Sequence, residues 1–250
     1  MTTGKKDFVF GIHAVDEAIK AGHEIDKILV RKDITNTAIK ELLSSAYQLN
    51  IPILKVPREK LSSITGKNHQ GIIALLASIR YGSLDNVISN AYQGGQDPTL
   101  LVLDRITDVR NFGAIARTAE GLGFHGIVIP DKGGARLNNE AVKTSSGALL
   151  HLPVCRVKSL LSALEFLKNS GIQVVSISEK SDINIYDAEL KGPLCLVLGS
   201  ESEGIHNDIL KKSDKILRIP MYGNISSYNV SVSMAMAGAE IIRQTKFIQT

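Results

Sequence analysis

The sequence has few of the features that would place it in a membrane, in an oxidising compartment or around a metal ion. Only two cysteines, Cys155 and Cys195, occur among its 250 residues, and each lies in an apolar run typical of a buried free thiol. The longest apolar run, GIIALLASI, is far shorter than a membrane span, and the opening MTTGKKDFVF has no stretch of signal-peptide length. We therefore expect a soluble, cytoplasmic protein without disulfide bonds.

Motifs for metals and nucleotides are also missing. The six histidines are scattered, and there is no HExxH, no Cys/His ligand spacing and no GxxxxGK[ST] phosphate loop, so we expect no metal site. Gly121, Gly123 and Gly126 have the spacing of a dinucleotide fingerprint, but they follow a helical segment and precede a strand-like one. That fingerprint needs the opposite order, in which glycines open a helix onto the phosphates. We therefore predict a helix C-cap and a turn here.

The composition is that of a globular protein with an uneven distribution of charge. Hydrophobic residues make up 44% of the chain, enough for one large or two modest cores. The formal net charge is +4; residues 1–80 hold 12 Lys and Arg against 8 Asp and Glu, whereas residues 81–250 hold 17 of each sign. This excess in the first third is compatible with a polyanionic partner and equally with ordinary solubility.

The hydrophobic patterns predict two α/β domains. Residues 1–80 alternate helical and extended segments in a small α/β unit, and the Gly, Asp and Pro cluster at 94–98 places a linker at 81–98. In residues 99–250, apolar strands of four to six residues alternate with helical segments. Strands that are apolar on both faces indicate a parallel sheet covered by helices on both sides.

Three polar loops follow strands of the second domain, at the edge where open α/β sheets bind ligands. The first contains Asp104 and Asp108, then Asn111 at an expected helix N-cap and Arg117 six residues later. The second loop spans 199–204 and the third 219–231. Capping, turn formation and helix propensity account for each loop taken alone. Three such loops at one sheet edge favour a ligand site.

In order along the chain, these loops resemble the three signatures of the SpoU/TrmH family of RNA ribose methyltransferases, within the SPOUT superfamily. Asn111 and Arg117 match the first signature, and Gly199, Glu201 and Gly204 match the second. The third, Ile-Pro-Met followed by Ser-x-Asn-Val-Ser, is matched at 219–221 and 227–231. The front segment, with FGIHAVDEAI and NHQGII, resembles the L30e-like substrate-binding domain of bacterial large-subunit rRNA guanosine methyltransferases.

The resemblance implies a fold and an activity. The fold would be a C-terminal parallel-sheet α/β domain with a deep trefoil knot, preceded by a small L30e-like α/β domain at 1–80. The activity would be methyl transfer from S-adenosylmethionine to the ribose 2'-hydroxyl of a guanosine in 23S rRNA, by a homodimer. Two alternatives stay open: ribose methylation of tRNA, and RNA binding without catalysis, although a pure binder would not need the polar set in the three loops.

The resemblance also assigns roles to particular residues. Those expected to contact S-adenosylmethionine are Leu198, Gly199, Ile219, Met221 and Tyr228. Tyr228 departs from the family, which usually has leucine there, and its ring is able to pack on an adenine face. Those expected to take part in catalysis are Asn111, Arg117, Glu201, Ser227 and Asn229, with Ser231 beside them.

Arg117 is the leading candidate for activating the hydroxyl. A guanidinium with a pKa above about 12 is a poor general base. We therefore expect Arg117 to bind the phosphate beside the target ribose and to stabilise developing alkoxide charge. The sequence leaves open whether it acts in its own subunit or across a dimer. Expected phosphate contacts elsewhere are Lys5, Lys6, Lys27, Arg31 and Lys32.

Overall fold

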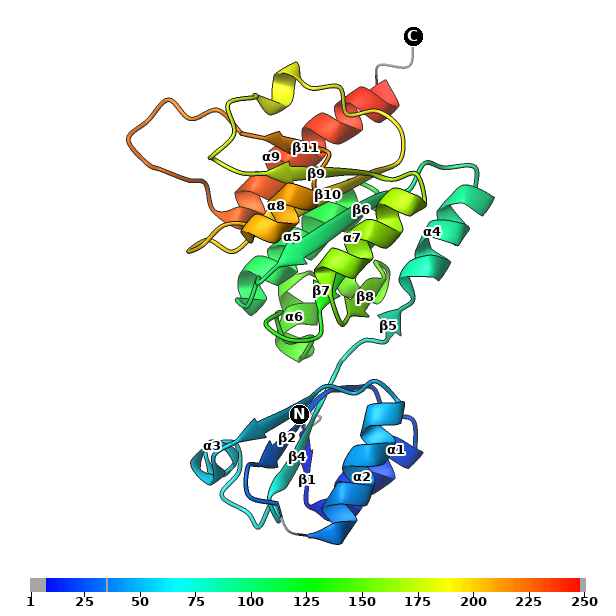
Figure 1. Cartoon of the computed structure of the whole chain (residues 1–250), viewed down its shortest axis with the longest axis vertical. Helices are drawn as coiled ribbons and strands as arrows, with labels where there is room; N and C mark the ends of the chain where they lie inside the picture. Colours follow the sequence, from blue (N-terminus) through cyan, green and yellow to red (C-terminus); the bar gives the residue numbers. More distant parts are fainter. Residues whose placement is uncertain (1–7, 35, 248–250) are drawn as a thin grey trace. The chain divides into compact units, whose positions relative to one another are not determined.

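The computed structural model describes residues 8–34 and 36–247, which form two compact units (Figure 1). The first unit takes in the chain up to Arg80 together with Arg136–Asn139, and the second takes in Tyr81–Ala135 and the chain from Glu140 onward. Lys5 and Lys6, expected to contact phosphates, lie outside the described residues. Within the described ranges, no helix has the length and apolar character needed to cross a membrane.

A mixed four-stranded sheet forms the centre of the first unit. Its strands are β1 (Phe8–Phe10), β2 (Ile25–Arg31), β3 (Ile53–Val56) and β4 (Ile72–Leu76), in the order β1-β4-β2-β3. Strand β4 is antiparallel to β1 and β2, whereas β2 and β3 are parallel. The helices are α1 (Ile12–Lys20), α2 (Thr37–Gln48) and α3 (Arg58–Ser62).

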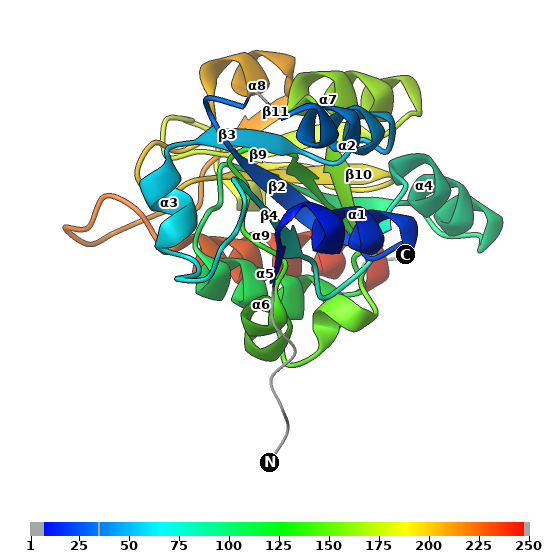
Figure 2. The same cartoon turned by 90° about the horizontal axis from the view of Figure 1, so that it is seen from below.

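Both faces of this sheet are covered, because residues 28–30 of β2 and all of β4 are apolar. Successive side chains of a strand point to opposite faces. Ile28 and Val30 therefore pack in one core with residues of α1 and α2, while Leu29 packs in another with Leu61 of α3. Figure 2 shows α3 on the other side of these strands from α1 and α2. The first unit thus has its own two-sided core.

The second unit is built on a seven-stranded sheet in which every neighbouring pair of strands is parallel. The order is β11-β9-β10-β6-β7-β8-β5. The strands are β5 (Tyr81–Gly82), β6 (Thr99–Asp104), β7 (Gly126–Pro130), β8 (Val154–Val157), β9 (Gln173–Ile177), β10 (Leu194–Gly199) and β11 (Lys215–Leu217). The helices are α4 (Leu84–Gln93), α5 (Val109–Gly121), α6 (Asn139–Thr144), α7 (Leu160–Asn169), α8 (Asn207–Lys212) and α9 (Val230–Ile242), with short turns η1 (Ala148–Leu150), η2 (Ile185–Asp187) and η3 (Arg243–Phe247).

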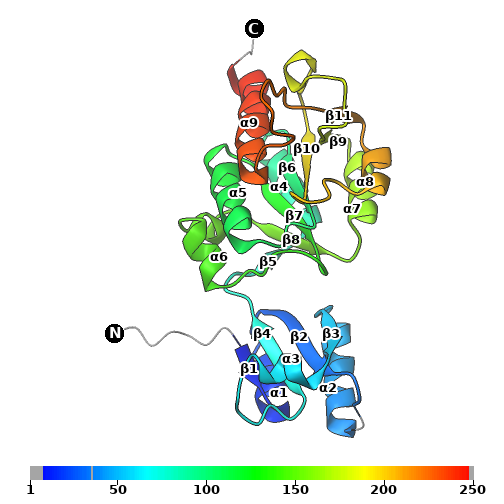
Figure 3. The same cartoon turned by 90° about the vertical axis from the view of Figure 1, so that its left-hand side faces the viewer.

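Helices cover both faces of this sheet (Figure 3). Helices α4, α7 and α8 share one core with alternate side chains of β6 and β10, and α5 packs against α9 on the other face. That packing is close at Gly238 of α9, where a Cβ atom would lie 2.7 Å from the Leu122 side chain. Every residue of β6 is buried, which confirms the prediction of a parallel sheet covered on both sides.

Two local predictions have different outcomes. The linker expected at 81–98 is instead part of the second unit, because Tyr81 pairs with β8 and α4 contributes Val87 and Ile88 to the core. The short helical stretch expected between Ser83 and the cluster at 94–98 is α4, an amphipathic helix of ten residues. At the dinucleotide-like glycines the prediction is confirmed: α5 ends at Gly121, Gly123 has a φ of 76°, and β7 starts at Gly126.

Both cysteines are buried free thiols, as predicted. Burial raises the pKa of the Cys155 thiol to about 12 and raises the pKa of the Cys195 thiol as well. Because the reactive form of cysteine is the thiolate, neither thiol is suited to nucleophilic chemistry.

Candidate active site

The carboxyl ends of the neighbouring strands β9 and β10 form one end of a cavity, which we name cavity A. Gly199 at the end of β10 is in register with Asp104 at the end of β6, as expected where parallel strands end at one sheet edge. Cavity A has a volume of about 360 Å³. Its lining includes all five residues predicted to contact the cofactor, Leu198, Gly199, Ile219, Met221 and Tyr228, together with Ser227.

Sequence reasoning missed one wall of cavity A. Ile177, Ser178, Glu179 and Lys180 line it, and they lie at the carboxyl end of β9 and directly after it. The strand itself was predicted, so the rule that ligands bind beyond the carboxyl ends of parallel strands would have found these residues. They match none of the three family signatures, which is why the resemblance did not point to them.

The loop at 199–206 is folded tightly back on itself, and Gly199 makes this possible. A Cβ atom on Gly199 would lie 2.2 Å from the backbone carbon of Gly204, far inside van der Waals contact. The Gly204 N–H donates to the Ser200 carbonyl oxygen at 2.9 Å, and Gly204 has a φ of 68°, which favours glycine. The two glycines of the second signature are therefore explained by the close approach of the chain to itself.

A second cavity, named cavity B, adjoins cavity A. It has a volume of about 470 Å³ and shares Ser200, Glu201, Ser202, Glu203 and Val230 with cavity A. The rest of its lining comes from the end of β6, the start of α5 and one glycine: Arg105, Ile106, Thr107, Asp108, Asn111 and Gly133. The loop that carries Glu201 thus separates two spaces at the same sheet edge.

Three of the predicted catalytic residues are joined by hydrogen bonds: Glu201, which lines both cavities, Asn111, which lines cavity B, and Asn229, which lines neither. The side-chain Nδ2 of Asn229 donates to Asn111 Oδ1 at 3.1 Å and also to the Glu201 carboxylate. The Asn229 Oδ1 caps α9 by accepting from the Ser231 N–H at 2.9 Å, and it accepts from the Ser231 hydroxyl at 2.6 Å. One amide therefore caps the last helix with its oxygen and connects the other two loops with its nitrogen.

The N-cap predicted at Asn111 is wrong. Helix α5 begins at Val109, and its N-cap is Asp108, whose Oδ1 accepts from the N–H groups of Arg110 and Asn111. Asn and Asp cap helices about equally well, so local propensity does not choose between them. Because Asn111 lies inside the first turn, its side chain is available to meet Asn229.

Arg117 lies apart from this cluster. It is exposed on α5, lines neither cavity A nor cavity B, and has no hydrogen bond or ion pair with any side chain in 8–34 or 36–247. Six residues along a helix rotate a side chain by about 240° and advance it about 9 Å, so Asn111 and Arg117 point in different directions. Within one chain, the structure does not bring Arg117 to the other four residues.

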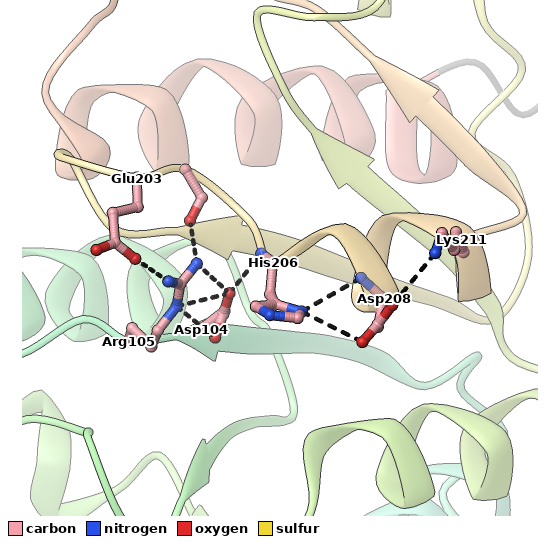
Figure 4. Close-up of polar contacts among 7 residues, drawn as sticks. Asp104, Arg105, Glu203, His206, Asp208 and Lys211 are labelled. Atoms are coloured by element: carbon pink, nitrogen blue, oxygen red, sulfur yellow. Dashed lines mark hydrogen bonds and ion pairs between the residues drawn. The ribbon is translucent and has the colours of Figure 1, made fainter.

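A network of charged groups connects β6 to the 199–206 loop (Figure 4). Asp104 is buried, with a relative exposure of 4%, and its carboxylate accepts from the His206 backbone N–H at 2.8 Å. Arg105 donates to that carboxylate at 3.2 Å, to the Gly204 carbonyl oxygen at 3.1 Å and to Glu203. Among the residues described, no group of three or more side chains has the composition of a metal site.

An open parallel sheet with adjoining cavities at its carboxyl edge is typical of α/β proteins that bind ligands there, and comparison with known proteins identifies the family. Residues 98–239 match the SpoU rRNA Methylase family, and residues 8–82 match the domain described as RNA 2'-O ribose methyltransferase substrate binding. Proteins described as TrmH family tRNA/rRNA methyltransferases are 35% identical in Staphylococcus saprophyticus, over 96% of each chain, and in Bacillus subtilis (YacO), over 95% of this chain and 96% of that one.

Solved structures share the fold. An AdoMet-bound rRNA methyltransferase from Sinorhizobium meliloti has a TM-score of 0.60 and 22% identity, covering 97% of this chain and 88% of the other. The Aquifex aeolicus TrmH/SpoU tRNA modifying enzyme has a TM-score of 0.55 and 29% identity, covering 60% of this chain and 76% of the other.

The chain belongs to the SpoU rRNA methylase family, which confirms the resemblance seen in its sequence. It is an RNA methyltransferase of a family that uses S-adenosylmethionine, as predicted. Membership of this enzyme family disfavours the alternative of RNA binding without catalysis.

Proposed function

We propose that this chain transfers the methyl group of S-adenosylmethionine to the ribose 2'-hydroxyl of a guanosine in 23S rRNA. The observation that carries the proposal is that cavity A adjoins cavity B at Glu201, which Asn229 joins by hydrogen bonds to Asn111 of cavity B. One cavity would hold the methyl donor and the other the target nucleoside. Methyl transfer needs the donor and acceptor in contact and in line, which two adjoining cavities allow.

The chemistry of cavity A fits S-adenosylmethionine. Apolar walls come from Leu198, Ile219 and Met221, and the ring of Tyr228 offers a face for an adenine. The carboxylates of Glu179 and Glu201 match the positive charges of a sulfonium and an ammonium group. Much of the remaining lining is polar, with serine hydroxyls and Lys180 able to hydrogen-bond to the cofactor, and a volume of about 360 Å³ is within the range of cofactor sites.

The residues between the cavities would orient the ribose. When bound, S-adenosylmethionine supplies a methyl group activated by the positive charge on its sulfur. The chain has to align the 2'-hydroxyl with that methyl group and stabilise the oxygen as it loses its proton. Asn111 lines cavity B and would hold the ribose, while Asn229, whose Nδ2 donates to Asn111 and to Glu201, would orient both side chains. Ser227 lines cavity A only, so its role would be on the donor side.

Arg117 would complete the site of a second subunit. We infer a homodimer because Arg117 is exposed and remote from the cavities of its own chain, although the family signature pairs it with Asn111. Apolar side chains near the site are also exposed: Tyr222 is 96% exposed, Ile225 73% and Val232 44%. An isologous contact through α5, α9 and the 219–229 loop would cover these side chains.

Ribosomal RNA is favoured over tRNA by the extent of the structural matches. The Sinorhizobium chain, described as an rRNA methyltransferase, aligns with 97% of this chain, whereas the Aquifex tRNA modifying enzyme aligns with 60%. The difference in coverage is consistent with a role for the front domain in selecting rRNA.

Guanosine is favoured by the carboxylates of cavity B. The charged side chains that line cavity B are three carboxylates, Asp108, Glu201 and Glu203, and one cation, Arg105. A carboxylate accepts hydrogen bonds only, and the Watson–Crick edge of guanine offers two adjacent N–H donors to such a group.

The finer features of the fold and location are also proposals. The 199–206 and 219–229 loops lie together around cavity A, which is compatible with the deep trefoil knot that the family resemblance implies. The first unit, with a mixed sheet between helices on its two faces, is proposed to be L30e-like. A substrate in the ribosome would place the protein in the cytoplasm.

The test is a methyl-transfer assay with radiolabelled S-adenosylmethionine and purified 23S rRNA or tRNA, both from cells that lack this gene. We expect label on 23S rRNA that maps to the ribose of a guanosine. The matched control is Asn229→Ser, which keeps a helix-capping side chain but loses the amide between the cavities. Label on tRNA alone would move the substrate to tRNA, and label on a base would refute ribose methylation.

A further inference from the structure

Arg105 has an unusual backbone conformation at the end of the central strand. It directly follows β6 and has a φ of 58°, one of four residues other than glycine with a positive φ in the described ranges. Such a conformation is unfavourable for a residue with a Cβ atom and persists where surrounding contacts determine it. Here those contacts are made by the guanidinium.

The guanidinium of Arg105 connects two parts of the chain that are about a hundred positions apart. Its Nε lies 3.3 Å from both carboxylate oxygens of Asp104, and its Nη2 lies 3.2 Å from Oδ2 of the same group. Across the cavity edge it donates to the Gly204 carbonyl oxygen at 3.1 Å and to the Glu203 carboxylate (Figure 4). The Arg105 side chain is 32% exposed and that of Asp104 6%, so their ion pair is largely shielded from solvent, whereas the Glu203 side chain is 67% exposed.

The same buried carboxylate also holds the far end of the loop. Asp104 Oδ2 accepts from the His206 N–H at 2.8 Å, while Arg105 holds positions 203 and 204. Inside the loop, the Glu203 N–H donates to the Ser200 hydroxyl at 3.2 Å. The stretch from 200 to 204 lines cavity A, and 200 to 203 lines cavity B as well.

We propose that Arg105 is a positioning residue for methyl transfer, which fixes the loop shared by the two cavities by joining Asp104 to Glu203 and Gly204. This proposal rests on the proposed function in taking cavity A as the S-adenosylmethionine site. Glu201, at the centre of the loop, then meets Asn229 without having to be ordered when ligands bind. Arg105 acts through the loop and needs no contact with the methyl group or the ribose.

Arg105→Gly is the sharpest variant, because glycine adopts a positive φ without strain and only the guanidinium is lost. We expect the dissociation constant of S-adenosylmethionine, measured by calorimetry on the full-length chain without RNA, to rise about tenfold. Glu203→Gln should give a similar rise. The double variant should bind S-adenosylmethionine no more weakly than either single variant, because both substitutions remove the same connection between Arg105 and Glu203. Lys211→Ala, which removes an exposed ion pair with Asp208 outside both cavities, is the control and should leave the constant unchanged.

Hydrogen exchange provides a readout that does not depend on the cofactor. The amides of Gly204 and His206 should exchange roughly tenfold faster in Arg105→Gly, because local opening of the loop becomes easier. Arg105→Lys should bind S-adenosylmethionine more tightly than Arg105→Gly but less tightly than wild type. A lysine can pair with Glu203, but it lacks the planar guanidinium that donates to Asp104, Glu203 and Gly204 together. If wild-type chain binds no S-adenosylmethionine, the proposed function fails, and exchange at the two amides still decides the role of Arg105.

Three results would overturn the proposal. One is unchanged exchange at both amides in Arg105→Gly. Another is unchanged S-adenosylmethionine affinity together with a raised KM for RNA, which would make Arg105 a direct RNA contact instead. A lower Tm with normal affinity well below the Tm would also refute it, because it would leave Arg105 with a purely structural role.

Discussion

Asn229 has two functions in this structure, and two substitutions separate them. Its Oδ1 caps α9, and its Nδ2 joins Asn111 to Glu201 between the cavities. Alanine removes both functions. Serine keeps a hydroxyl that accepts hydrogen bonds from the first turn of the helix, but it has no amide to reach the other two loops.

The expected magnitudes follow from these contacts. Loss of the cap in Asn229→Ala should cost about 1 kcal/mol of unfolding free energy, because one N–H of the first turn loses its acceptor. For a unit of about 170 residues, that corresponds to a Tm lower by about 3 °C. Asn229→Ser should lie within about 1 °C of wild type, because serine is as good an N-cap as asparagine. Both variants should lose roughly 100-fold in kcat, because the ribose is no longer held in line.

The assay combines thermal unfolding with single-turnover methyl transfer at saturating S-adenosylmethionine. The Tm values of wild type, Asn229→Ala and Asn229→Ser without ligand give the contribution of the cap to stability. Their transfer rates give the contribution of the Asn229 amide to catalysis. Wild-type turnover in Asn229→Ser, with loss only in Asn229→Ala, would refute the reasoning and reduce Asn229 to a helix cap.

Three further predictions concern other parts of the second unit. Gly199→Ala should destabilise the chain by about 3 kcal/mol because its Cβ would overlap the Gly204 backbone, whereas Gly204→Ala, which has open space and only an unfavourable φ, should cost about 1 kcal/mol in urea unfolding. Mixing inactive Arg117→Ala with inactive Asn229→Ser should restore about a quarter of wild-type activity if Arg117 acts across a dimer, since half of the dimers would have one intact site; no recovery would place Arg117 in its own subunit. The hydrogen bond from Arg243 lowers the pKa of the Glu240 carboxyl from its usual 4.5. The stabilisation that this ionised carboxyl provides is therefore present above pH 4.5 and is lost as the pH falls through the lower pKa of the folded state. The free energy of unfolding of Glu240→Gln should vary less with pH in the acid range than that of wild type, and an equal variation would contradict this assignment.

Much of the fold and of cavity A was predictable because it depends on local patterns. Strands apolar on both faces, such as β6 and β10, have to lie inside a covered parallel sheet, and the polar residues after them have to emerge at one edge. The family resemblance named five cofactor residues in the loops at this edge, from Leu198 to Tyr228, and all five line a single cavity. The wall at 177–180 follows from the same rule applied to β9.

Only the tertiary structure decided how these pieces are joined. Asn111 and Asn229 are 118 positions apart, and no local pattern states that their amides meet or that Glu201 joins them. Asp108 takes the cap expected at Asn111, and α4 packs into the core where a linker was expected, because packing chooses between residues and segments of equal local propensity. The role of Arg105 is likewise invisible in sequence, since a charge next to a strand acquires its meaning from the carboxylates that the fold brings around it.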